Sequence, residues 1–449
     1  MSSLAVFGAG YAGLVTAAGF AELGHSVAIR DIDSEKIEAL RALRAPFHEP
    51  GLDELLERNG HRLTFTLHPA EALSGAEFVF VCVGTPATYS GDADLSAVWT
   101  VLDELGEAGR DAVLVMKSTV PVGTGEKLRA GLDARGLDHV GYVACPEFLA
   151  EGSAVRDFLR PDRVVIGSFR NADGDRVEAL HAGLDAPVVR TDVASAEMIK
   201  LAANAFLGTR ISFINEIANV CELVGADVEQ VAHGMGLDKR IGTRYLNAGI
   251  GFGGSCFPKD ISFLKLLAGN SGYHFQLLNA VIEVNELQKR RLVSKLQKHL
   301  GSLRGKSIAL LGLAFKPNTD DLREAPSIVL ASRLLAEGAD VRAWDPVADA
   351  SSVLRGITFS DSALEAVRGA DAAVIVTEWD ELRDFARQEI RDAMRNPLVV
   401  DGRNLLDPVE TAKAGFAYEG MGRPTSHFGG LPETEEPELP SEELPEPTP

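Results

Sequence analysis

The residues best suited to chemistry lie in segment 251–260, which reads Gly-Phe-Gly-Gly-Ser-Cys-Phe-Pro-Lys-Asp. Its three glycines carry no Cβ, so the backbone can bend sharply and approach a ligand closely. Pro258 fits the first turn of a helix, where its missing N–H is not needed. Cys256 is therefore expected at a helix N-terminus with Lys259 nearby, and both features favour the thiolate. We interpret Cys256 as a nucleophile, although a lone cysteine in a loop is more often inert packing.

Two further pairs of residues suit proton transfer. Glu147 and Glu151 are four residues apart, so they share a face if this turn is helical, and like charges on one face need compensation. Lys200 and Asn204 lie one turn apart in an apolar stretch, where a lysine is rarely buried without a partner. The alternatives are a solvated surface pair for the glutamates and a solvated stripe for Lys200.

The start of the chain predicts a dinucleotide site. An apolar run at 4–8 leads into Gly8, Gly10 and Gly13, then into a small-residue helix over 14–23. This is the beginning of a Rossmann unit, in which a pyrophosphate lies on the helix N-terminus.

The acid of the same unit indicates which dinucleotide is bound. A second strand over 26–30 ends at Asp31, which is expected to accept hydrogen bonds from the adenosine ribose and to repel a 2′-phosphate. Arg30 would weaken that preference only if it pointed the same way, and alternation along a strand predicts that it does not. The expected cofactor is NAD rather than NADP.

More apolar runs predict strands, and their positions are 78–83, 112–117, 142–145, 164–167, 306–312, 339–345, 372–377 and 398–401. Thr85 and Thr119 follow two of them, at the edge where open parallel sheets bind ligands, although ordinary turn chemistry is the alternative. The second half lacks Gly-x-Gly-x-x-Gly, so we expect it to hold a nucleotide differently.

The helical patterns place the link between these halves. A helix over about 194–223 would be about 45 Å long, enough to join two domains and to carry an oligomer interface. Another helix is expected over 273–300. The predicted fold is α/β, with two Rossmann-like doubly wound parallel-sheet domains joined by a long central helix.

Composition excludes several kinds of partner. The chain of 449 residues has a net charge of -21, which argues against nucleic acid. Apolar runs are too short for a membrane span, and Met1-Ser2-Ser3 starts no signal peptide, so we expect a cytoplasmic protein. The four cysteines, at 82, 145, 221 and 256, have a spacing that fits neither a disulfide framework nor a metal cluster. Residues 429–449 contain seven Glu and no cation, which is typical of a disordered, solubilising tail.

Four motifs follow one another along the chain: the glycine turn at 8–13, segment 146–152, Lys200 with Asn204, and segment 251–260. On these motifs the sequence resembles the UDP-glucose/GDP-mannose dehydrogenase family over about residues 3–425. Segments 313–327 and 401–404 (Asp-Gly-Arg-Asn) also resemble the family's C-terminal signatures. The resemblance implies an enzyme that oxidises a nucleotide sugar twice at one carbon, making two NADH and a uronic acid. UDP-glucose is the expected substrate, with GDP-mannose or a UDP-N-acetylhexosamine as alternatives, and a homodimer or larger homo-oligomer is expected.

The resemblance also suggests a division of the chain. We expect an NAD-binding Rossmann domain at 1–193, a central helical and dimerisation region with the cysteine loop at 194–300, a UDP-sugar-binding Rossmann-like domain at 301–428, and the acidic tail at 429–449. A rival hypothesis is a non-catalytic NAD-binding protein whose tail recruits partners.

Catalytic roles are implied by the resemblance alone. Cys256 would hold the sugar carbon as a thiohemiacetal and then a thioester. Lys200 and Asp260 would handle a water or the developing alkoxide, with Asn204 as a further donor. Glu147, Glu151 and Thr119 would position the hydrolytic water, and either glutamate can be the base.

Binding roles are implied in the same way. The cofactor contacts would be Gly8, Gly10, Tyr11, Gly13, Asp31, Lys36, Thr85, Thr119, Glu151, Lys259 and Arg323. The substrate contacts would be Phe148, Leu149, Lys200, Asn204, Arg240, Tyr245, Asn247, Gly253, Phe315, Lys316 and Arg403. Arg240 and Arg403 resemble residues that serve the sugar from across a subunit boundary, and Asn247 stands where some members carry a lysine.

Overall fold

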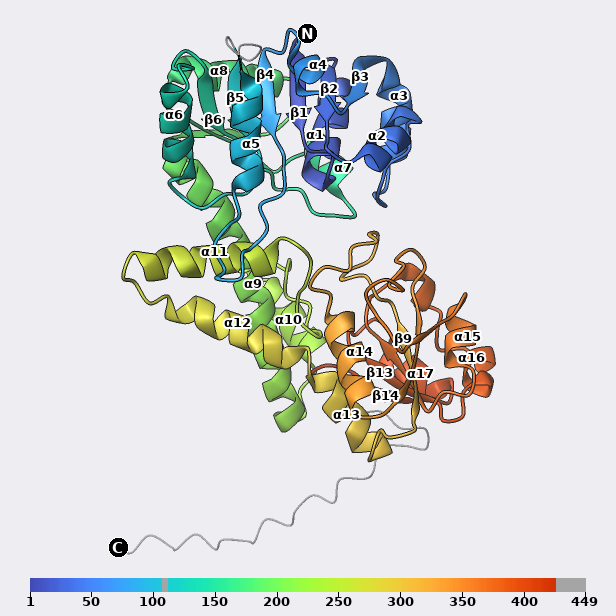
Figure 1. The fold of residues 1–449 in the computed structure, drawn as a ribbon. Coiled ribbons are helices and arrows are strands. Elements are labelled where there is room, and N and C mark those ends of the chain that lie inside the picture. Colours follow the sequence, from blue (N-terminus) through green and yellow to red (C-terminus); the bar gives the residue numbers. More distant parts are fainter. Residues whose placement is uncertain (107–111, 425–449) are drawn as a thin grey trace, which may run out of the picture.

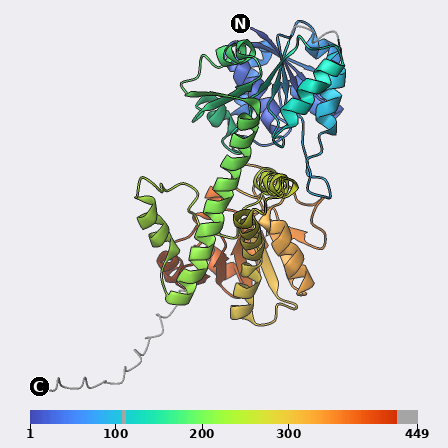
Figure 2. The same cartoon turned by 90° about the vertical axis from the view of Figure 1, so that its left-hand side faces the viewer.

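A computed structural model describes residues 1–106 and 112–424 of the chain. Two β-sheets, each covered by helices, lie at opposite ends of the molecule, and one long helix runs between them (Figures 1 and 2). This confirms the predicted α/β class with two doubly wound sheets. The predicted acidic tail at 429–449 lies outside the described residues.

The first sheet has eight strands in the order β3-β2-β1-β4-β5-β6-β7-β8. Its neighbouring strands are parallel except β6 and β7, and the first six follow the order of a dinucleotide-binding sheet. The strands are β1 (Ser3–Phe7), β2 (Ser26–Arg30), β3 (Leu63–Thr66), β4 (Phe78–Val81), β5 (Val113–Met116), β6 (Gly141–Ala144), β7 (Val164–Ser168) and β8 (Val188–Thr191).

Helices cover both faces of this sheet, which is why its central strands β4, β5 and β6 are buried along their whole length. The helices are α1 (Tyr11–Glu22), α2 (Ser34–Arg41), α3 (Leu52–Asn59), α4 (Pro69–Leu73), α5 (Ser96–Leu105), α6 (Thr124–Ala134), α7 (Ala154–Leu159) and α8 (Asn171–Leu180), with a short 3₁₀ helix, η1 (Gly60–Arg62). One apolar core lies on each face.

The second sheet repeats the strand order of the first six strands of the first sheet. Its order is β11-β10-β9-β12-β13-β14, with all pairs parallel. The strands are β9 (Ser307–Leu311), β10 (Asp340–Trp344), β11 (Thr358–Phe359), β12 (Ala372–Ile375), β13 (Leu398–Asp401) and β14 (Ala417–Glu419). The helices are α14 (Pro326–Ala336), α15 (Ala363–Val367), α16 (Gln388–Ala393) and α17 (Pro408–Lys413), with the 3₁₀ helix η2 (Asp380–Leu382).

The central helix α9 (Val193–Val224) spans 32 residues, close to the predicted range. The Asp192 side chain caps its start, and Gly225, with a φ of 76°, ends it. At 1.5 Å per residue it is about 48 Å long, and Figure 2 shows it passing from one sheet to the other. The remaining helices of this region are α10 (Val228–Gly236), α11 (Phe257–Asn270), α12 (Gln276–Gln288) and α13 (Arg291–Leu300). The prediction of a single helix over 273–300 is therefore wrong, because the helix is interrupted at residues 289–290, between α12 and α13.

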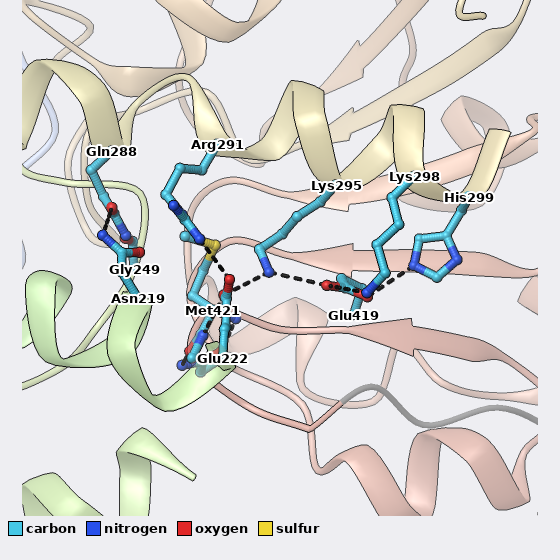
Figure 3. Close-up of polar contacts among 12 residues, drawn as sticks. Asn219, Glu222, Gly249, Gln288, Arg291, Lys295, Lys298, His299, Glu419 and Met421 are labelled. Carbon is cyan, nitrogen blue, oxygen red and sulfur yellow. Dashed lines mark hydrogen bonds and ion pairs between the residues drawn. The ribbon is translucent and has the colours of Figure 1, made fainter. Parts of the chain in front are cut away.

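An ion-pair network fixes the far end of α9 to the second sheet (Figure 3). The Glu222 carboxylate accepts hydrogen bonds from Arg291 Nη2 and Lys295 Nζ, at 2.6 Å each. Lys295 also donates to Glu419 of β14 at 3.0 Å, and Lys298 and His299 contact the same carboxylate. Helices α9 and α13 and strand β14 are thus held together by charge pairs, of which Lys295–Glu419 is buried.

Within the two described ranges, no helix is both long and apolar enough to cross a lipid bilayer.

Candidate active site

The cysteine loop leads into α11 as predicted. Cys256 is the N-cap of this helix, and Pro258 lies in its first turn. Gly251 and Gly254 have φ values of 91° and 82°, so two of the three glycines adopt a left-handed backbone that other residues rarely accept. The Gly254 N–H donates to the Arg323 carbonyl at 2.9 Å, which ties the loop to the second sheet's domain.

The surroundings of Cys256 oppose the predicted preference for the thiolate. Burial and the carboxylates of Glu147 and Asp260 raise the pKa of the Cys256 thiol, although Lys200 opposes them. Lys259 was expected to help, but its Nζ donates to Asp260 Oδ1 at 2.7 Å. The thiol is therefore protonated at neutral pH, because burial and two acids outweigh one cation.

Lys200 is the cation of this group. It is buried on α9, and its Nζ donates to Glu147 Oε1 at 2.8 Å. Burial alone lowers the pKa of Lys200, but Glu147, Asp260 and Cys256 together raise it above its ordinary value. Lys200 is a fixed ammonium group, and a solvated stripe is excluded.

Asn204 and Asp260 complete the group around the thiol. Asn204 Nδ2 donates to Asp260 Oδ2 at 2.6 Å, and both side chains are buried. With Lys259 on its other oxygen, Asp260 is held between α9 and α11. Helix α9 therefore presents Lys200 and Asn204 on the face that packs on the cysteine helix.

The two glutamates do not share a helical face. Residues 145–150 form a loop, and α7 begins only at Ala154. Although burial opposes its ionisation, Lys200 lowers the pKa of Glu147, so this carboxylate is charged at neutral pH. Burial and Asp321 raise the pKa of Glu151 to about 8, with Arg323 opposing them. The environment thus separates the two acids, one ionised and one protonated at pH 7.

The glycine turn of the first sheet is shaped for a pyrophosphate. Gly8 has a φ of 102°, and a Cβ there would lie 2.6 Å from the Cys82 carbonyl oxygen. A Cβ on Gly13 would lie 1.9 Å from the Gly8 carbonyl oxygen, so the helix packs directly on the turn. A Cβ on Gly10 would meet nothing within 4 Å, and α1 has no side-chain cap. Open space at an uncapped helix N-terminus fits a bound dinucleotide.

The acid after β2 keeps its expected position. Asp31 Oδ2 accepts a hydrogen bond from Ala9 N at 2.6 Å, which places the carboxylate beside the glycine turn. Arg30 points to the other face of the strand, where it pairs with Glu104 at 2.5 Å. The arginine is therefore not available to a 2′-phosphate beside Asp31.

Other expected cofactor contacts lie along the same edge. Thr85 Oγ1 donates to the Thr119 carbonyl at 2.7 Å, so the two threonines lie together. The Tyr11 hydroxyl donates a hydrogen bond to Glu49 Oε2 at 2.5 Å. Lys36 is partly exposed, 4.0 Å from Asp33.

The second sheet contributes the loop that follows β9. A Cβ on Gly253 would lie 2.2 Å from the Glu324 carbonyl oxygen, and one on Gly254 would lie 2.7 Å from the Phe315 ring. Burial lowers the pKa of Lys316, although Glu151 opposes this effect. The Arg323 guanidinium lies 3.4 Å from Glu151. Loops from the domains of both sheets therefore surround the cysteine loop.

Arg403 contacts the cysteine loop of its own chain. Its guanidinium donates to the carbonyls of Gly251 and Phe315, at 3.1 Å each. The expectation that it acts from across a subunit boundary is not reflected in these contacts.

The remaining substrate candidates divide into two groups. Phe148 lies under the Arg163 guanidinium, 3.5 Å from ring centroid to Cζ, and Leu149 N donates to Glu147. Arg240, Tyr245 and Asn247 are exposed. The Arg240 side chain is 89% exposed and pairs with Asp238 of the same loop, so the single chain does not bring it to Cys256.

Sequence reasoning missed Glu49. Its carboxylate accepts hydrogen bonds from Gly152 N and Ala154 N, at 2.6 Å each, and from Tyr11. It thereby fixes the loop of Glu151 to the start of α1. The only sequence signal was an acid beside a proline and glycine at 49–51, which is ordinary turn composition.

The site lies between two domains with the sheet topology of nucleotide-binding proteins, and it contains Cys256, the buried ammonium of Lys200 and the buried carboxylate of Asp260. This combination defines a dinucleotide-dependent dehydrogenase with a thiol in its site. Family models agree with this class. Residues 2–185 match the NAD binding domain of the UDP-glucose/GDP-mannose dehydrogenase family, 194–287 its central domain and 309–408 its UDP binding domain. The chain belongs to this family.

Individual relatives are similar along their whole length. A UDP-glucose 6-dehydrogenase of Pseudomonas aeruginosa is 49% identical over 441 residues, which cover 94% of this chain and 97% of the relative. UDP-glucose 6-dehydrogenase TuaD of Bacillus subtilis is 44% identical, covering 96% and 97%. The solved structure of a UDP-glucose dehydrogenase from Pyrobaculum islandicum has a TM-score of 0.87 at 38% identity, covering 94% and 98%.

Proposed function

We propose that this chain oxidises UDP-glucose to UDP-glucuronate with two NAD, through a covalent intermediate on Cys256. The overall reaction consumes one water and releases two NADH and three protons. The observation that carries the proposal is the group formed by the buried Lys200, Asn204 and Asp260 with the partly buried Cys256 and Glu147. The names of the relatives that match over nearly the whole chain support UDP-glucose as the sugar nucleotide.

Lys200 stabilises negative charge on the sugar oxygen. Loss of a proton and a hydride from the sugar alcohol gives an aldehyde. The Cys256 sulfur then adds to the aldehyde carbon, while its proton passes to the carbonyl oxygen, and a thiohemiacetal results. A buried ammonium group next to that oxygen stabilises developing charge better than water does. Burial raises the pKa of the Cys256 thiol, and a neutral thiol suits this addition because its proton is used in the step.

Covalent capture explains why one site performs both oxidations. A second hydride loss converts the thiohemiacetal into a thioester, which water cleaves to the carboxylate and the free thiol. The tether prevents loss of a reactive aldehyde between the two steps. NAD, when bound at the glycine turn of the first sheet, would supply the hydride acceptor for both oxidations.

We assign the hydrolytic base to Glu147. It is ionised and lies beside Lys200, in the group that surrounds the thiol. Glu151, with a pKa of about 8, carries a proton at neutral pH and so cannot accept another. Thr119 and Glu151 are assigned to positioning, at the edge where Thr85 and Arg323 lie.

The residues at the first sheet are assigned to NAD, as expected from sequence. The glycine turn would hold the pyrophosphate, and Asp31 the adenosine ribose. On the second sheet, Lys316 and Arg403 are assigned to the uridine diphosphate and Phe315 to the uridine.

We also propose a homodimer built on α9. Five of its apolar side chains are 48–85% exposed in the single chain: Phe206, Phe213, Val220, Leu223 and Val224. Phe206, Phe213 and Val220 repeat every seven residues, which places them on one stripe of the helix. A second copy would cover this stripe and could also bring Arg240 to the neighbouring site, which would explain its exposure. Light scattering that gives the mass of one chain would contradict the proposal.

The proposal places the enzyme in the cytoplasm with no nucleic-acid or membrane partner. The four cysteines are free thiols, which suits a reducing compartment that also supplies NAD and sugar nucleotides.

The stoichiometry of the reaction tests the function. With limiting UDP-glucose and excess NAD, the purified protein should form two NADH per sugar, together with UDP-glucuronate. A ratio of one would remove the thioester step. Faster oxidation of GDP-mannose or of a UDP-N-acetylhexosamine, assayed in parallel, would show that the chain acts on one of those sugars instead. A related structure of that kind is the UDP-D-ManNAc dehydrogenase of Pyrococcus horikoshii, which is 30% identical with a TM-score of 0.84.

A further inference from the structure

The Glu197 carboxylate joins α9 to the first sheet's domain. Its side chain is buried near the start of α9. Oε2 accepts a hydrogen bond from Gly123 N and Oε1 from Gly125 N, at 2.7 Å each. These N–H groups open α6, whose own N-cap, Gly123, has no side chain to satisfy them. A carboxylate from another helix therefore caps α6, at the end where the helix dipole favours negative charge.

The segment that Glu197 holds also carries Thr119. This residue lies in the turn from β5 to α6, four residues before Gly123. At its other side the turn is fixed by Thr85, whose hydroxyl donates to the Thr119 carbonyl. The position of Thr119 is thus set between one contact within the sheet and one contact to α9.

Glu197 shares its helix face with the residues that surround the thiol. Lys200 follows it by three residues and Asn204 by seven, a spacing that keeps all three on one side of a helix. All three side chains are buried. The face of α9 that presents Lys200 to Cys256 therefore also presents the anchor of the Thr119 turn.

We propose that Glu197 is a positioning residue, which sets the place of Thr119 relative to Lys200. The inference rests on the proposed function, because it concerns the same oxidation. Glu197 touches backbone N–H groups and not the reacting thiol, so its effect passes through the turn that it holds.

The packing leaves little room for another arrangement. A Cβ on Gly125 would lie 2.4 Å from Val193 Cγ1, 2.9 Å from Tyr142 Cε1 and 3.1 Å from Glu197 Oε1. Glycine at this position lets the carboxylate reach both N–H groups. Gly125→Ala would push the turn away from Glu197 without altering the carboxylate.

Protonation should loosen the same contact. Burial raises the pKa of Glu197 to about 7, against the Gly123 and Gly125 N–H groups, which lower it. The titratable groups that face it are Glu126 of α6 and Tyr142 of β6. As the pH falls below about 7 the carboxyl gains a proton, loses its charge and keeps one good acceptor. The hold on α6 should then weaken.

The test is Glu197→Gln, assayed with UDP-glucose and NAD from pH 6 to 9. We expect kcat to fall about 10- to 100-fold, as small misplacements in active sites do, with little change in KM for UDP-glucose. The inflection near pH 7 should disappear from the kcat profile. Glu57→Gln is the matched control, since it changes an exposed acid of α3, which lies on the other side of the first sheet's domain from α6 (Figure 1), and it should leave kcat and its pH profile unaltered.

A merely structural cap would give a different result. Folded Glu197→Gln protein, with a lowered melting temperature but wild-type kcat and pH profile, would overturn the inference. Should this variant not fold, Gly125→Ala decides by the same criteria. Wild-type protein assayed in parallel separates the two proposals. If it makes no uronate, the proposed function fails, whereas a normal wild type with unaffected variants removes only the role of Glu197.

Discussion

The two sheets of this protein share a strand order, a glycine after the first strand and an aspartate after the second, yet they present different surfaces to a nucleotide. In both sheets a glycine with positive φ follows the first strand: Gly8 at 102° and Gly312 at 87°. In both, an aspartate follows the second strand and accepts hydrogen bonds from backbone near that glycine, Asp31 from Ala9 and Asp345 from Leu313. These positions follow from the strand order, because the ends of neighbouring parallel strands meet there.

The difference lies in what comes after the glycine. Helix α1 begins at Tyr11, so its N-terminus lies directly on the turn, whereas α14 begins only at Pro326. The intervening loop carries Phe315 and Arg323 to the cysteine loop, and it carries Lys316 close enough for Cys256 to affect its pKa. The shared topology thus fixes where a nucleotide can lie, and the segment after the first strand decides how it is held.

The largest expected effect comes from the residue that both sheets surround. Cys256→Ser should lower uronate formation about 10³-fold or more, because serine cannot form the thioester. Affinities for NAD and UDP-glucose should change less than about twofold, since neither nucleotide site is altered. Steady-state rates and calorimetric titration measure both. Cys221→Ser, the same change at the far end of α9, is the control, and equal losses in the two variants would refute the assignment.

A pair of substitutions tests whether Asp31 serves NAD binding while Asp345 serves stability. Asp31→Asn should weaken NAD binding by about 10-fold or more, through a lost charged hydrogen bond to the ribose. Asp345 Oδ2 already accepts hydrogen bonds from Leu313 N, Ala314 N and Trp379 Nε1, and its Oδ1 from Val347 N and Ala348 N. Asp345→Asn should therefore lower the free energy of unfolding by about 2 kcal/mol and leave NAD affinity unchanged. The reverse pattern, seen by urea unfolding and NAD titration, would mean that the sheets exchange roles.

A smaller effect concerns the bridge between the two domains. Glu151 has a pKa of about 8 in the folded protein against an ordinary value of 4.5. The folded state therefore holds this proton more tightly than the unfolded state, and stability falls as the pH rises from about 4.5 to 8. Glu151→Gln should flatten this decline in melting temperatures recorded across that range. Glu38→Gln, an exposed site on α2, should not, and a wild-type slope in Glu151→Gln would contradict the electrostatic account.

The smallest effect is expected outside both sheets. Deleting residues 430–449 removes seven Glu and should leave kcat and both KM values within about twofold, because the catalytic residues assigned above lie between positions 119 and 260. Solubility at high protein concentration should fall. A large loss of turnover in this truncation would show that the tail takes part in the reaction.

The sequence predicts most of the fold because local patterns carry it. Apolar runs mark the inner strands of both sheets, and Gly8, Gly10 and Gly13 mark the first turn. The four edge strands, β3, β8, β11 and β14, were not predicted, because they are short and only partly apolar. Cys256, Pro258 and the glycines before them predict the helix start, since a turn and a cap are properties of adjacent residues.

The charge states could not be predicted in the same way. The pKa of Cys256 depends on Glu147 and Lys200, which are distant in the sequence, and on burial. Glu147 and Glu151 look alike in the sequence, and only Lys200 beside one and Asp321 beside the other make them different. Glu49 and Glu197 gave no distinctive signal, because most of their partners are backbone N–H groups of remote turns.

The most direct test of the central claim is the mass of the protein during turnover. Glu147→Gln, mixed with UDP-glucose and NAD and quenched in acid, should accumulate a UDP-glucuronyl thioester on the peptide that contains Cys256, because formation of the thioester does not need the hydrolytic base. Mass spectrometry of that peptide should show the added uronyl nucleotide and its loss on treatment with hydroxylamine. Two NADH per active site with no mass added at Cys256 would contradict the account.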